Sequence, residues 1–298
     1  MFLEEIFEKL LMLGNDVFVN EKMEHHTSFR IGGPVSFYVI PNSIQSFIET
    51  YKFLSEKMPL KVVGKCTNIL PRDEKMDISV ISTEKLNNIE YQNNRIICES
   101  GVSLKKLCIE AMEKGFSGFE KAYGIPGSVG GAVYMNAGAY GWETAENLDY
   151  VIAFDGEKII KLKVNNLDFS YRSSIFKKEK KLIILKAAFR YSLSEKEKIR
   201  REMLEIIQKR IQKQPLEFPS AGSVFKRPKP DFYVGTAIEK LGFKGFTIGG
   251  AQISEKHAGF IINLGNAKSK DVKEIIKVIK NKIRQEFNVN LETEIEIW

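Results

Sequence analysis

Hydrophobic and polar positions along the chain predict short strands interleaved with helices. The apolar runs Phe37–Ile40 and Leu60–Val63 have the length of strands, and residues 44–57 between them have helical spacing. This alternation predicts a small α/β lobe. A second series of elements is predicted after it, with strands at 78–81, 95–98, 150–154, 158–164 and 182–191 and a helix at 104–114. Asp155-Gly156 is typical of a hairpin turn between two of these strands.

The clearest boundary in the pattern lies at Ser194. Ser194 and Glu197 fit a capping box, in which a hydroxyl and a glutamate three residues later satisfy free backbone N–H groups at a helix start. Apolar residues then recur at helical spacing until Pro215, which stops the run. A third segment therefore begins at Ser194. Its predicted elements are a strand at 259–263, a helix that starts near Ser269, and a closing strand at 294–297.

Composition and charge narrow the class of protein. The chain has 298 residues, of which 43% are hydrophobic, so it can bury a core and is not a fibrous or disordered protein. Lys plus Arg number 45 and Asp plus Glu 38, which gives a net charge of +7 and an affinity for anions. The basic clusters at 177–181 and 196–201 contain acids but no aromatics, which favours solvated faces over a nucleic-acid footprint.

Cysteine and histidine usage gives no sign of a disulfide framework or a metal site. The chain has an odd number of cysteines, Cys66, Cys98 and Cys108, and no two of them have C-x-x-C spacing. The histidines, His25, His26 and His257, lack further metal-ligating residues at a suitable spacing, and no metal is expected. The first residues have helical spacing rather than the pattern of a signal peptide, and no apolar run is long enough to span a membrane. We expect a cytoplasmic protein.

Glycine is concentrated in one segment. Residues 124–141 read Gly-Ile-Pro-Gly-Ser-Val-Gly-Gly-Ala-Val-Tyr-Met-Asn-Ala-Gly-Ala-Tyr-Gly and hold six of the 22 glycines. A backbone without Cβ atoms can turn sharply and approach phosphate oxygens, although tight turns packed on strands have the same composition. The chain has no G-x-G-x-x-G between a strand and a helix and no G-x-x-x-x-G-K-[ST], so neither a Rossmann site nor a P-loop is indicated.

The segment 124–141 closely resembles the flavin-binding segment of the UDP-N-acetylenolpyruvoylglucosamine reductase family, also called the UDP-N-acetylmuramate dehydrogenase family. Further stretches match the same family in the same order, at residues 26–34, 169–176, 219–226 and 291–294. The resemblance covers the chain from near Asn20 onward, and the length is that of the shorter of the family's two variants.

The resemblance implies an α+β fold with two domains. Residues 1–193 would form an FAD-binding domain of the vanillyl-alcohol-oxidase/p-cresol-methylhydroxylase type. Its two lobes would lie near 20–75 and 76–193, after an N-terminal helix. Residues 194–298 would form an α/β substrate-binding domain.

The resemblance also implies the reaction. The family reduces the enolpyruvyl ether of UDP-N-acetylglucosamine to UDP-N-acetylmuramate, a cytoplasmic step of peptidoglycan precursor synthesis. NADPH reduces FAD, and the flavin N5 delivers hydride to the vinyl carbon of the substrate. We therefore expect FAD as cofactor, NADPH and a UDP-sugar as ligands, and a monomer that binds neither nucleic acid nor membranes.

Three residues match the family's catalytic residues. Arg172, in Ser-Tyr-Arg-Ser-Ser, would stabilise the negative charge that reaches the substrate carboxylate, which a guanidinium can bind with two hydrogen bonds. Ser223, in Ala-Gly-Ser-Val-Phe, would donate the proton. Glu294, in the closing Leu-Glu-Thr-Glu, would help polarise the carboxylate or the enol. Outside these motifs, each would be read as an ordinary surface or turn residue.

Ligand contacts carried over from the family involve two further groups of residues. Those expected to bind FAD are Gly64, Thr67, Asn68, Gly127, Ser128 and Gly131. Cys66 and Thr67 stand where the family usually has glycine and serine, and this places a side chain where backbone normally approaches a phosphate. Lys213, or Arg210 just before it, and Arg227 are expected to bind the substrate diphosphate, although the family usually has Asn at the position of Arg227.

Other classes of function remain open from the residues alone. A flavoprotein oxidase of the same fold would need a base that removes a proton rather than a group that donates one. A catalytically silent protein that binds a sugar nucleotide would carry no flavin. A nucleic-acid-binding protein would show a steep salt dependence of affinity.

Overall fold

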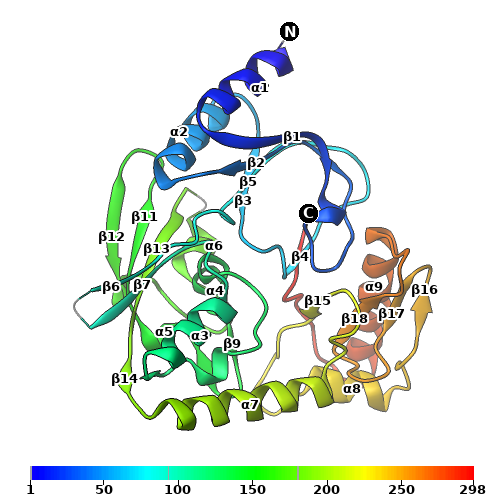
Figure 1. The fold of residues 1–298 in the computed structure, drawn as a ribbon. Coiled ribbons are helices and arrows are strands. Elements are labelled where there is room, and N and C mark those ends of the chain that lie inside the picture. Colours follow the sequence, from blue (N-terminus) through cyan, green and yellow to red (C-terminus); the bar gives the residue numbers. More distant parts are fainter. Residues whose placement is uncertain (1, 93, 180) are drawn as a thin grey trace. The chain divides into compact units, whose positions relative to one another are not determined.

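The computed structural model describes residues 2–92, 94–179 and 181–298 (Figure 1). The chain forms two compact units. Unit 1 comprises Met1–Asn20, Ser36–Lys65 and Asp77–Gln208, and unit 2 comprises Glu21–Val35, Cys66–Met76 and Lys209–Trp298. The C-terminal part of the chain is thus joined in one unit by two short segments from much earlier in the sequence. The assignment of domains to residues 1–193 and 194–298 stays a prediction.

Two larger sheets provide the framework for most of unit 1. The first has the strand order β1-β2-β5-β3, with β3 and β5 parallel, and the second is antiparallel with the order β12-β11-β13-β7-β6. Their strands are β1 (Asn15–Lys22), β2 (Pro34–Pro41), β3 (Leu60–Val63), β5 (Met76–Ser82), β6 (Ile89–Gln92), β7 (Arg95–Glu99), β11 (Leu148–Phe154), β12 (Ile159–Lys163) and β13 (Ile183–Arg190). Two-residue strands form two small ladders, β8 (Phe116–Ser117) with β14 (Ser192–Leu193) and β9 (Gly138–Ala139) with β10 (Trp142–Glu143).

Helices accompany these sheets (Figure 1). They are α1 (Phe2–Met12), α2 (Ile44–Ser55), α3 (Leu104–Glu113), α4 (Val129–Met135), α5 (Thr144–Asn147), α6 (Ile175–Lys178) and α7 (Lys196–Lys213), the last of which ends in unit 2. The alternation of side chains along β13 buries both faces of the second sheet, since Ile184 belongs to the core that contains α3 and α4 and Leu185 to the core that contains α1 and α2. The glycine-rich helix α4 packs on β13 and β7.

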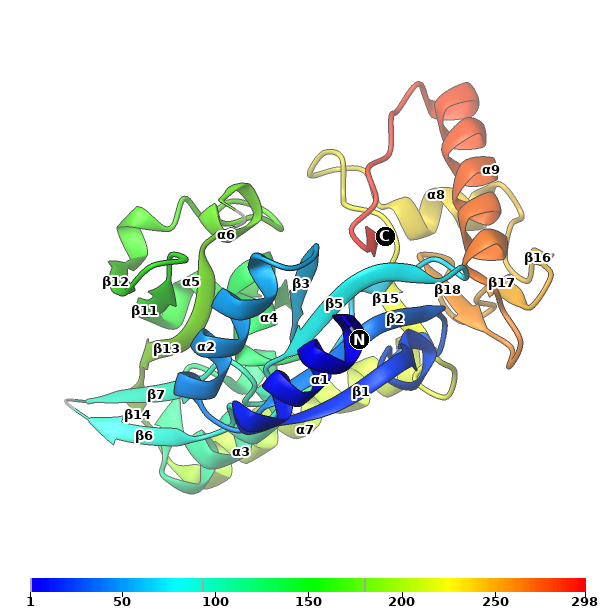
Figure 2. The ribbon, with the colours of Figure 1, turned by 90° about the horizontal axis from the view of Figure 1, so that it is seen from above.

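Unit 2 contains a small antiparallel sheet and two helices. The sheet has the order β15-β18-β17-β16, and Figure 2 shows α9 alongside it, with α8 adjoining α9. The elements are β15 (Ser220–Ser223), α8 (Val234–Lys240), β16 (Thr247–Ile248), β17 (Ala251–Ile253), β18 (Phe260–Asn263) and α9 (Ser269–Phe287). A short parallel pair joins β4 (Ile69–Leu70) to the closing strand β19 (Glu296–Ile297).

The two early segments of unit 2 are part of its core. Phe29, Ile31 and Leu70 are buried in the same cluster as the apolar stripe of α9. The buried Asn263 side chain donates to the carbonyls of Phe29 and Arg30, at 3.0 and 3.3 Å. Apolar packing and buried hydrogen bonds therefore hold residues 21–35 to the C-terminal part of the chain.

Most of the predicted elements lie where the hydrophobic pattern places them. β3 spans Leu60–Val63 as predicted, and α2 begins at Ile44 as predicted. The turn after Phe154 is stabilised by Asp155, whose Oδ1 accepts hydrogen bonds from the N–H groups of Glu157 and Lys158.

Several predicted ends differ from the structure by one or two residues, and hydrogen bonds and strand pairing account for two of them. The first intrahelical bond of α7 goes to the carbonyl of Glu195, and the Ser194 N–H instead donates to Gly115, so the helix starts at Lys196 without the predicted capping box. The closing strand begins at Glu296 rather than Glu294, because only Glu296 and Ile297 pair with β4. Among the described residues, no helix is long and apolar enough to cross a membrane.

Candidate active site

The glycine-rich segment turns into helix α4 at Ser128. The Ser128 hydroxyl caps this helix by accepting from the Gly131 N–H at 3.3 Å. The N–H groups of Val129 and Gly130 donate to the carbonyls of Val102 and Ser100, both at 2.8 Å. The first N–H groups of α4 are therefore used inside unit 1, and the glycines serve close packing more than direct phosphate binding by these groups.

Two glycines give this segment its shape. A Cβ at Gly130 would lie 2.8 Å from the Cβ of Ser100, so any side chain there would push α4 away from the chain after β7. A Cβ at Gly131 would meet only Ser128 Oγ, at 3.5 Å. Helix α4 is thus tightly packed at Gly130 and presents an open backbone surface at Gly131.

Gly64, another residue predicted to bind FAD, lies against Ser128 at the start of α4. A Cβ at Gly64 would lie 2.2 Å from the Ser128 hydroxyl, so the loop after β3 approaches the start of α4 only because residue 64 is glycine. Gly64, Ser128 and Gly131 are therefore brought together within unit 1, and Gly127, with φ of 143°, precedes them in the same turn. Thr67 follows Gly64 in this loop but belongs to unit 2 and is partly buried.

Arg172 lies at the tip of a tight turn that is attached to α4. The turn is closed by two hydrogen bonds between the backbones of Ser170 and Ser173, at 3.0 and 3.1 Å. Arg172 has φ of 56°, and its guanidinium donates to the carbonyl of Gly138 at 2.8 Å and stacks on Tyr171. Left-handed backbone is uncommon for residues with a side chain and concentrates at functional sites.

Asn136 anchors this turn, a role that the sequence analysis did not assign. The buried Asn136 side chain donates to the carbonyl of Ser170 at 3.2 Å and to the carboxylate of Glu143 at 2.8 Å. It also accepts from the Ala145 N–H at 3.1 Å. Its position inside the glycine-rich motif was the signal that could have identified it. The turn with Arg172 and helix α4 are consequently held as one piece.

In unit 2, backbone hydrogen bonds connect Ser223 and Glu294. Val224, which directly follows Ser223, accepts from the Glu294 N–H at 2.7 Å and donates its own N–H to the carbonyl of Gly259 at 3.0 Å. Ser223 pairs with Phe260 of β18, after an irregularity in the register of β15, and its side chain is exposed. The main chain of Val224 thus links the backbone at two predicted catalytic residues.

The bonds continue on both sides of Val224. Phe225 forms a bridge with Thr293, and the Lys226 N–H donates to the carbonyl of Glu292 at 2.9 Å. The side chains of Lys226 and Glu292 pair at 3.0 Å, and this pairing lowers the pKa of the Glu292 carboxyl. Residues 223–226 and 292–294 therefore lie next to each other as a short two-stranded ladder.

Asn68 forms hydrogen bonds with the main chain of Glu294 and Glu296. Its side-chain amide donates to the carbonyl of Glu294 at 3.1 Å, and its own carbonyl accepts from the Glu296 N–H at 2.9 Å. The structure therefore brings this predicted FAD contact together with a predicted catalytic residue inside unit 2.

The residues expected at the substrate diphosphate differ in exposure. Lys213 ends α7 and is exposed, whereas Arg210 is buried, at 6% relative exposure. Arg227 is exposed and its guanidinium carbon lies 4.5 Å from the ring centre of Tyr233. Of the two alternatives on α7, the structure favours Lys213 as the group presented to a ligand.

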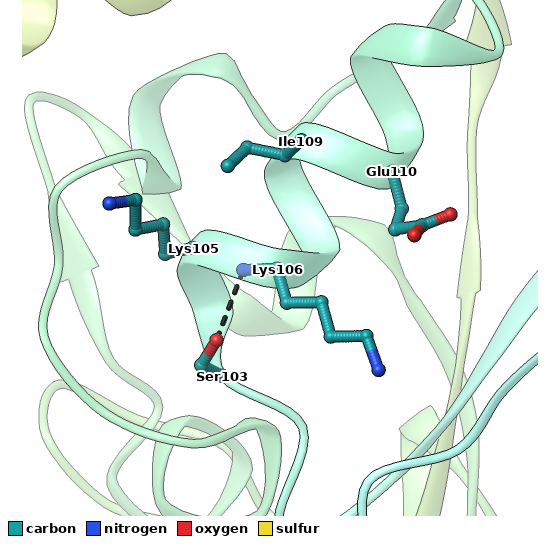
Figure 3. Close-up of a pocket in the computed structure, with 5 residues that line it drawn as sticks. All are labelled: Ser103, Lys105, Lys106, Ile109 and Glu110. Atoms are coloured by element: carbon teal, nitrogen blue, oxygen red, sulfur yellow. Dashed lines mark hydrogen bonds between the residues drawn. The ribbon is translucent and has the colours of Figure 1, made fainter.

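None of the predicted site residues lies in the shallow pocket on the outer side of α3 (Figure 3). Its lining side chains diverge from the helix, as Figure 3 shows for Lys105 and Lys106, and the hydroxyl of Ser103 caps the helix at the Lys106 N–H. Polar groups that diverge do not define a ligand orientation.

The two buried cysteines of unit 1 are structural. Burial raises the pKa of the thiols of Cys98 and Cys108, and a thiol that stays protonated is unreactive.

Comparisons with known proteins agree with this arrangement. Residues 35–157 match a family of FAD binding domains, and residues 214–298 match the family described as UDP-N-acetylenolpyruvoylglucosamine reductase, C-terminal domain. The UDP-N-acetylenolpyruvoylglucosamine reductase of Thermosipho melanesiensis is 59% identical over 294 residues, which cover 99% of this chain and 100% of that protein. The protein of the same name from Fervidobacterium nodosum is 58% identical, with 99% and 96% covered.

A solved structure shares the fold. The crystal structure of UDP-N-acetylenolpyruvylglucosamine reductase from Thermus caldophilus superimposes with a TM-score of 0.81 at 32% identity, and covers 95% of this chain and 98% of that one. The chain belongs to the UDP-N-acetylenolpyruvoylglucosamine reductase family of FAD-dependent oxidoreductases.

Proposed function

We propose that the chain reduces UDP-N-acetyl-3-O-(1-carboxyvinyl)-glucosamine to UDP-N-acetylmuramate with NADPH, and that Arg172, Ser223 and Glu294 carry the chemistry on the substrate. The observation that supports this most is the bond from the Glu294 N–H to the Val224 carbonyl, at 2.7 Å, which ties the backbone of Glu294 to the residue that follows Ser223. A proton donor and a polarising group both have to act on one small enol, so a fixed spacing suits them.

The residues of unit 1 fit FAD. Gly64 lets its loop pack against Ser128, and Gly131 next to this contact presents backbone with little side-chain cover, which a dinucleotide needs for close approach. Gly64, Gly127, Ser128 and Gly131 would hold the cofactor, together with Thr67 and Asn68. When bound, FAD supplies hydride transfer, since it accepts a hydride from NADPH and passes one to the terminal vinyl carbon.

Arg172 would bind the carboxylate of the substrate. Addition of hydride to the vinyl carbon moves an electron pair toward the adjacent carbon and the carboxylate, and the resulting enolate carries more negative charge there than the substrate does. A guanidinium held in place by the Gly138 carbonyl is oriented before the charge develops, so it stabilises the transition state more than the ground state.

Ser223 would donate its proton to the carbon next to the carboxylate. A hydroxyl is a weak acid, so it suffices only toward a strongly basic enolate carbon placed against it. Glu294 would polarise the carboxylate or the enol from the neighbouring position. Lys213 and Arg227 would bind the diphosphate, where the exposed positive charge of each pairs with phosphate oxygens.

The test uses the purified protein under anaerobic conditions. We expect a flavin absorption spectrum that bleaches on addition of NADPH and returns on addition of the UDP-enolpyruvyl sugar. The absence of flavin would indicate a silent sugar-nucleotide-binding protein. Oxygen consumption with simple sugars, without colour return with the enolpyruvyl sugar, would indicate an oxidase instead.

Replacement of Ser223 tests the assignment of the proton donor. We expect Ser223→Ala to leave bleaching by NADPH unchanged and to slow colour return by about 10²-fold, the usual magnitude for general acid catalysis. Ser192→Ala, at an exposed serine of β14, is the matched control and should change neither rate. Equal rates of colour return in Ser223→Ala and the parent, measured by stopped flow, would refute the role of Ser223.

A further inference from the structure

His257 lies in the turn between β17 and β18 and is held there by contacts on several sides. Its ring packs on Phe260 with centroids 5.0 Å apart, and a Cβ at Gly235 of α8 would lie 3.2 Å from its Cε1. The Ser254 hydroxyl accepts from the His257 N–H at 3.2 Å. The orientation of the imidazole is therefore fixed by the packing of unit 2.

One ring nitrogen of His257 has a defined role in this turn. Nδ1 accepts a hydrogen bond from the Gly259 N–H at 3.0 Å. A nitrogen that accepts carries no proton, so the neutral ring has its hydrogen on Nε2. The imidazole thus acts as the partner of a backbone N–H that belongs to a partly buried turn.

The peptide of Gly259 leads directly to the predicted catalytic residues. While the Gly259 N–H is held by His257, the carbonyl of the same residue accepts from the Val224 N–H at 3.0 Å, and Val224 in turn accepts from the Glu294 N–H. Three hydrogen bonds, linked through the Cα atoms of Gly259 and Val224, therefore connect the imidazole to the backbone on which Ser223 and Glu294 are carried.

We propose that His257 is a positioning residue that keeps Ser223 and Glu294 at their working spacing through Gly259 and Val224. This proposal rests on the proposed function. The N–H and C=O of one residue belong to adjacent peptide groups, so the coupling is mechanical: loss of the acceptor frees the Gly259 N–H, and the Gly259 carbonyl then holds Val224 less firmly. Protonation of His257 would turn Nδ1 from an acceptor into a donor that opposes the Gly259 N–H, and the series would then be broken at its first bond.

The surroundings of His257 determine the pH at which its imidazole is protonated. Burial lowers its pKa, and among the charged neighbours Lys244 lowers it and Glu239 raises it. Lys244 and Glu239 pair with each other at 2.6 Å, and the adjacent Lys256 pairs with Glu217 at 3.5 Å, so these charges largely offset one another. The neutral ring, and the positioning it provides, is fully present above the ordinary histidine pKa and is lost as the pH falls through the lowered one.

Two substitutions separate the acceptor from the ring. The side-chain oxygen of His257→Asn takes the place of Nδ1 and accepts without titrating, whereas His257→Leu fills the space and accepts nothing. We expect His257→Leu to slow colour return by the enolpyruvyl sugar by up to about 10-fold, the equivalent of one hydrogen bond, and to leave bleaching by NADPH unchanged. In His257→Asn, colour return should be as fast as in the parent at neutral pH, and its rate should no longer fall in acid. His25→Asn, at an exposed histidine of unit 2, is the matched control.

Amide hydrogen exchange tests the same inference without substrate, on the purified protein. We expect the amides of Val224, Gly259 and Glu294 to exchange faster in His257→Leu than in the parent and His257→Asn at one pH. In the parent their protection, taken relative to the intrinsic exchange rate at each pH, should fall below the His257 pKa. If the enzyme does not act on the enolpyruvyl sugar but exchange follows this pattern, the proposed function fails and the positioning stands. Unchanged exchange in His257→Leu, or equal slowing of both flavin reactions, would overturn the proposal.

Discussion

Cys66 and Arg172 both adopt a left-handed backbone conformation, with φ of 49° and 56°. This conformation costs a residue with a side chain about 1–2 kcal/mol relative to ordinary backbone. At Arg172 the strain accompanies a guanidinium that is held by the Gly138 carbonyl, which is typical of a site where geometry matters more than stability. At Cys66 the same backbone conformation is one that glycine adopts without strain, in keeping with the glycine that the family resemblance leads us to expect at this position.

Substitutions of Cys66 should separate the backbone strain from the side chain. In Cys66→Gly, relief of the left-handed strain is offset by about 0.5–1 kcal/mol of glycine entropy and by the loss of a buried thiol, so we expect a change of less than about 1 kcal/mol. Cys66→Val should destabilise the protein by about 1–3 kcal/mol, because a branched Cβ fits this backbone poorly. Urea unfolding measures both.

A matched substitution lies in the same protein. Cys98→Val changes an equally buried thiol in strand β7, where a branched residue is favoured, and should have the smaller effect. If Cys66→Val proved no less stable than Cys98→Val, strain at Cys66 would be excluded.

At the scale of elements, helix α9 starts with its N-terminus held by a distant residue. The carboxylate of Asp73 accepts from the N–H groups of Ser269 and Lys270, at 2.7 and 3.1 Å. These groups have no partner within a helix, and a negative charge there also suits the helix dipole. A residue of the segment 66–76 thus completes a helix that begins nearly two hundred residues later.

Removal of this cap should destabilise unit 2. We expect Asp73→Ala to lower the free energy of unfolding by about 1 kcal/mol and Asp73→Asn by less, since the amide oxygen still accepts while the charge is lost. Chemical denaturation followed by circular dichroism measures the difference. Equal stability of Asp73→Ala and the parent would show that other partners replace the carboxylate.

The elements that the sequence predicts well are those whose signal lies within a few neighbouring residues. Strand β3 and helix α2 carry their own periodicity, and Asp155 makes its turn within four residues. Helix α4 was missed, because two glycines lower its helical propensity and its packing on β13 and β7 is tertiary. The start of α7 was misplaced, since the Ser194 N–H is used by Gly115 rather than by a cap.

The site was predicted through motifs rather than through geometry. Family resemblance predicts Arg172, Ser223 and Glu294 as catalytic residues, but no pattern indicates that the main chain of Val224 connects two of them or that Asn136 holds the turn of the third. Such roles depend on main-chain hydrogen bonds between distant segments, which leave no periodicity in the sequence.

At the scale of the whole molecule, the C-terminal unit is not continuous in the chain. Its core includes Phe29, Ile31 and Leu70, and Asn263 binds the carbonyls of Phe29 and Arg30. A fragment of residues 194–298 would lack these groups. We expect such a fragment to show little cooperative unfolding when it is expressed alone, as measured by circular dichroism during heating, while the full chain unfolds cooperatively.

Adding back the missing segment tests whether its absence is the reason that the fragment fails to fold. Addition of a synthetic peptide of residues 21–35 should increase the helical signal of the fragment, because it returns Phe29 and Ile31 to the core. A fragment that unfolds cooperatively on its own would instead show that residues 194–298 are an autonomous domain.

The ladder between residues 223–226 and 292–294 has a consequence for how such chains can diverge. Because its partners are peptide groups, the side chain of Val224 can drift among apolar residues without moving Ser223 or Glu294. A single inserted or deleted residue in either segment would instead change which residue pairs with Val224, and so displace Ser223 relative to Glu294. Divergence of related chains can therefore change the side chain of Val224, but it cannot change the length of either segment without moving the residues beside it.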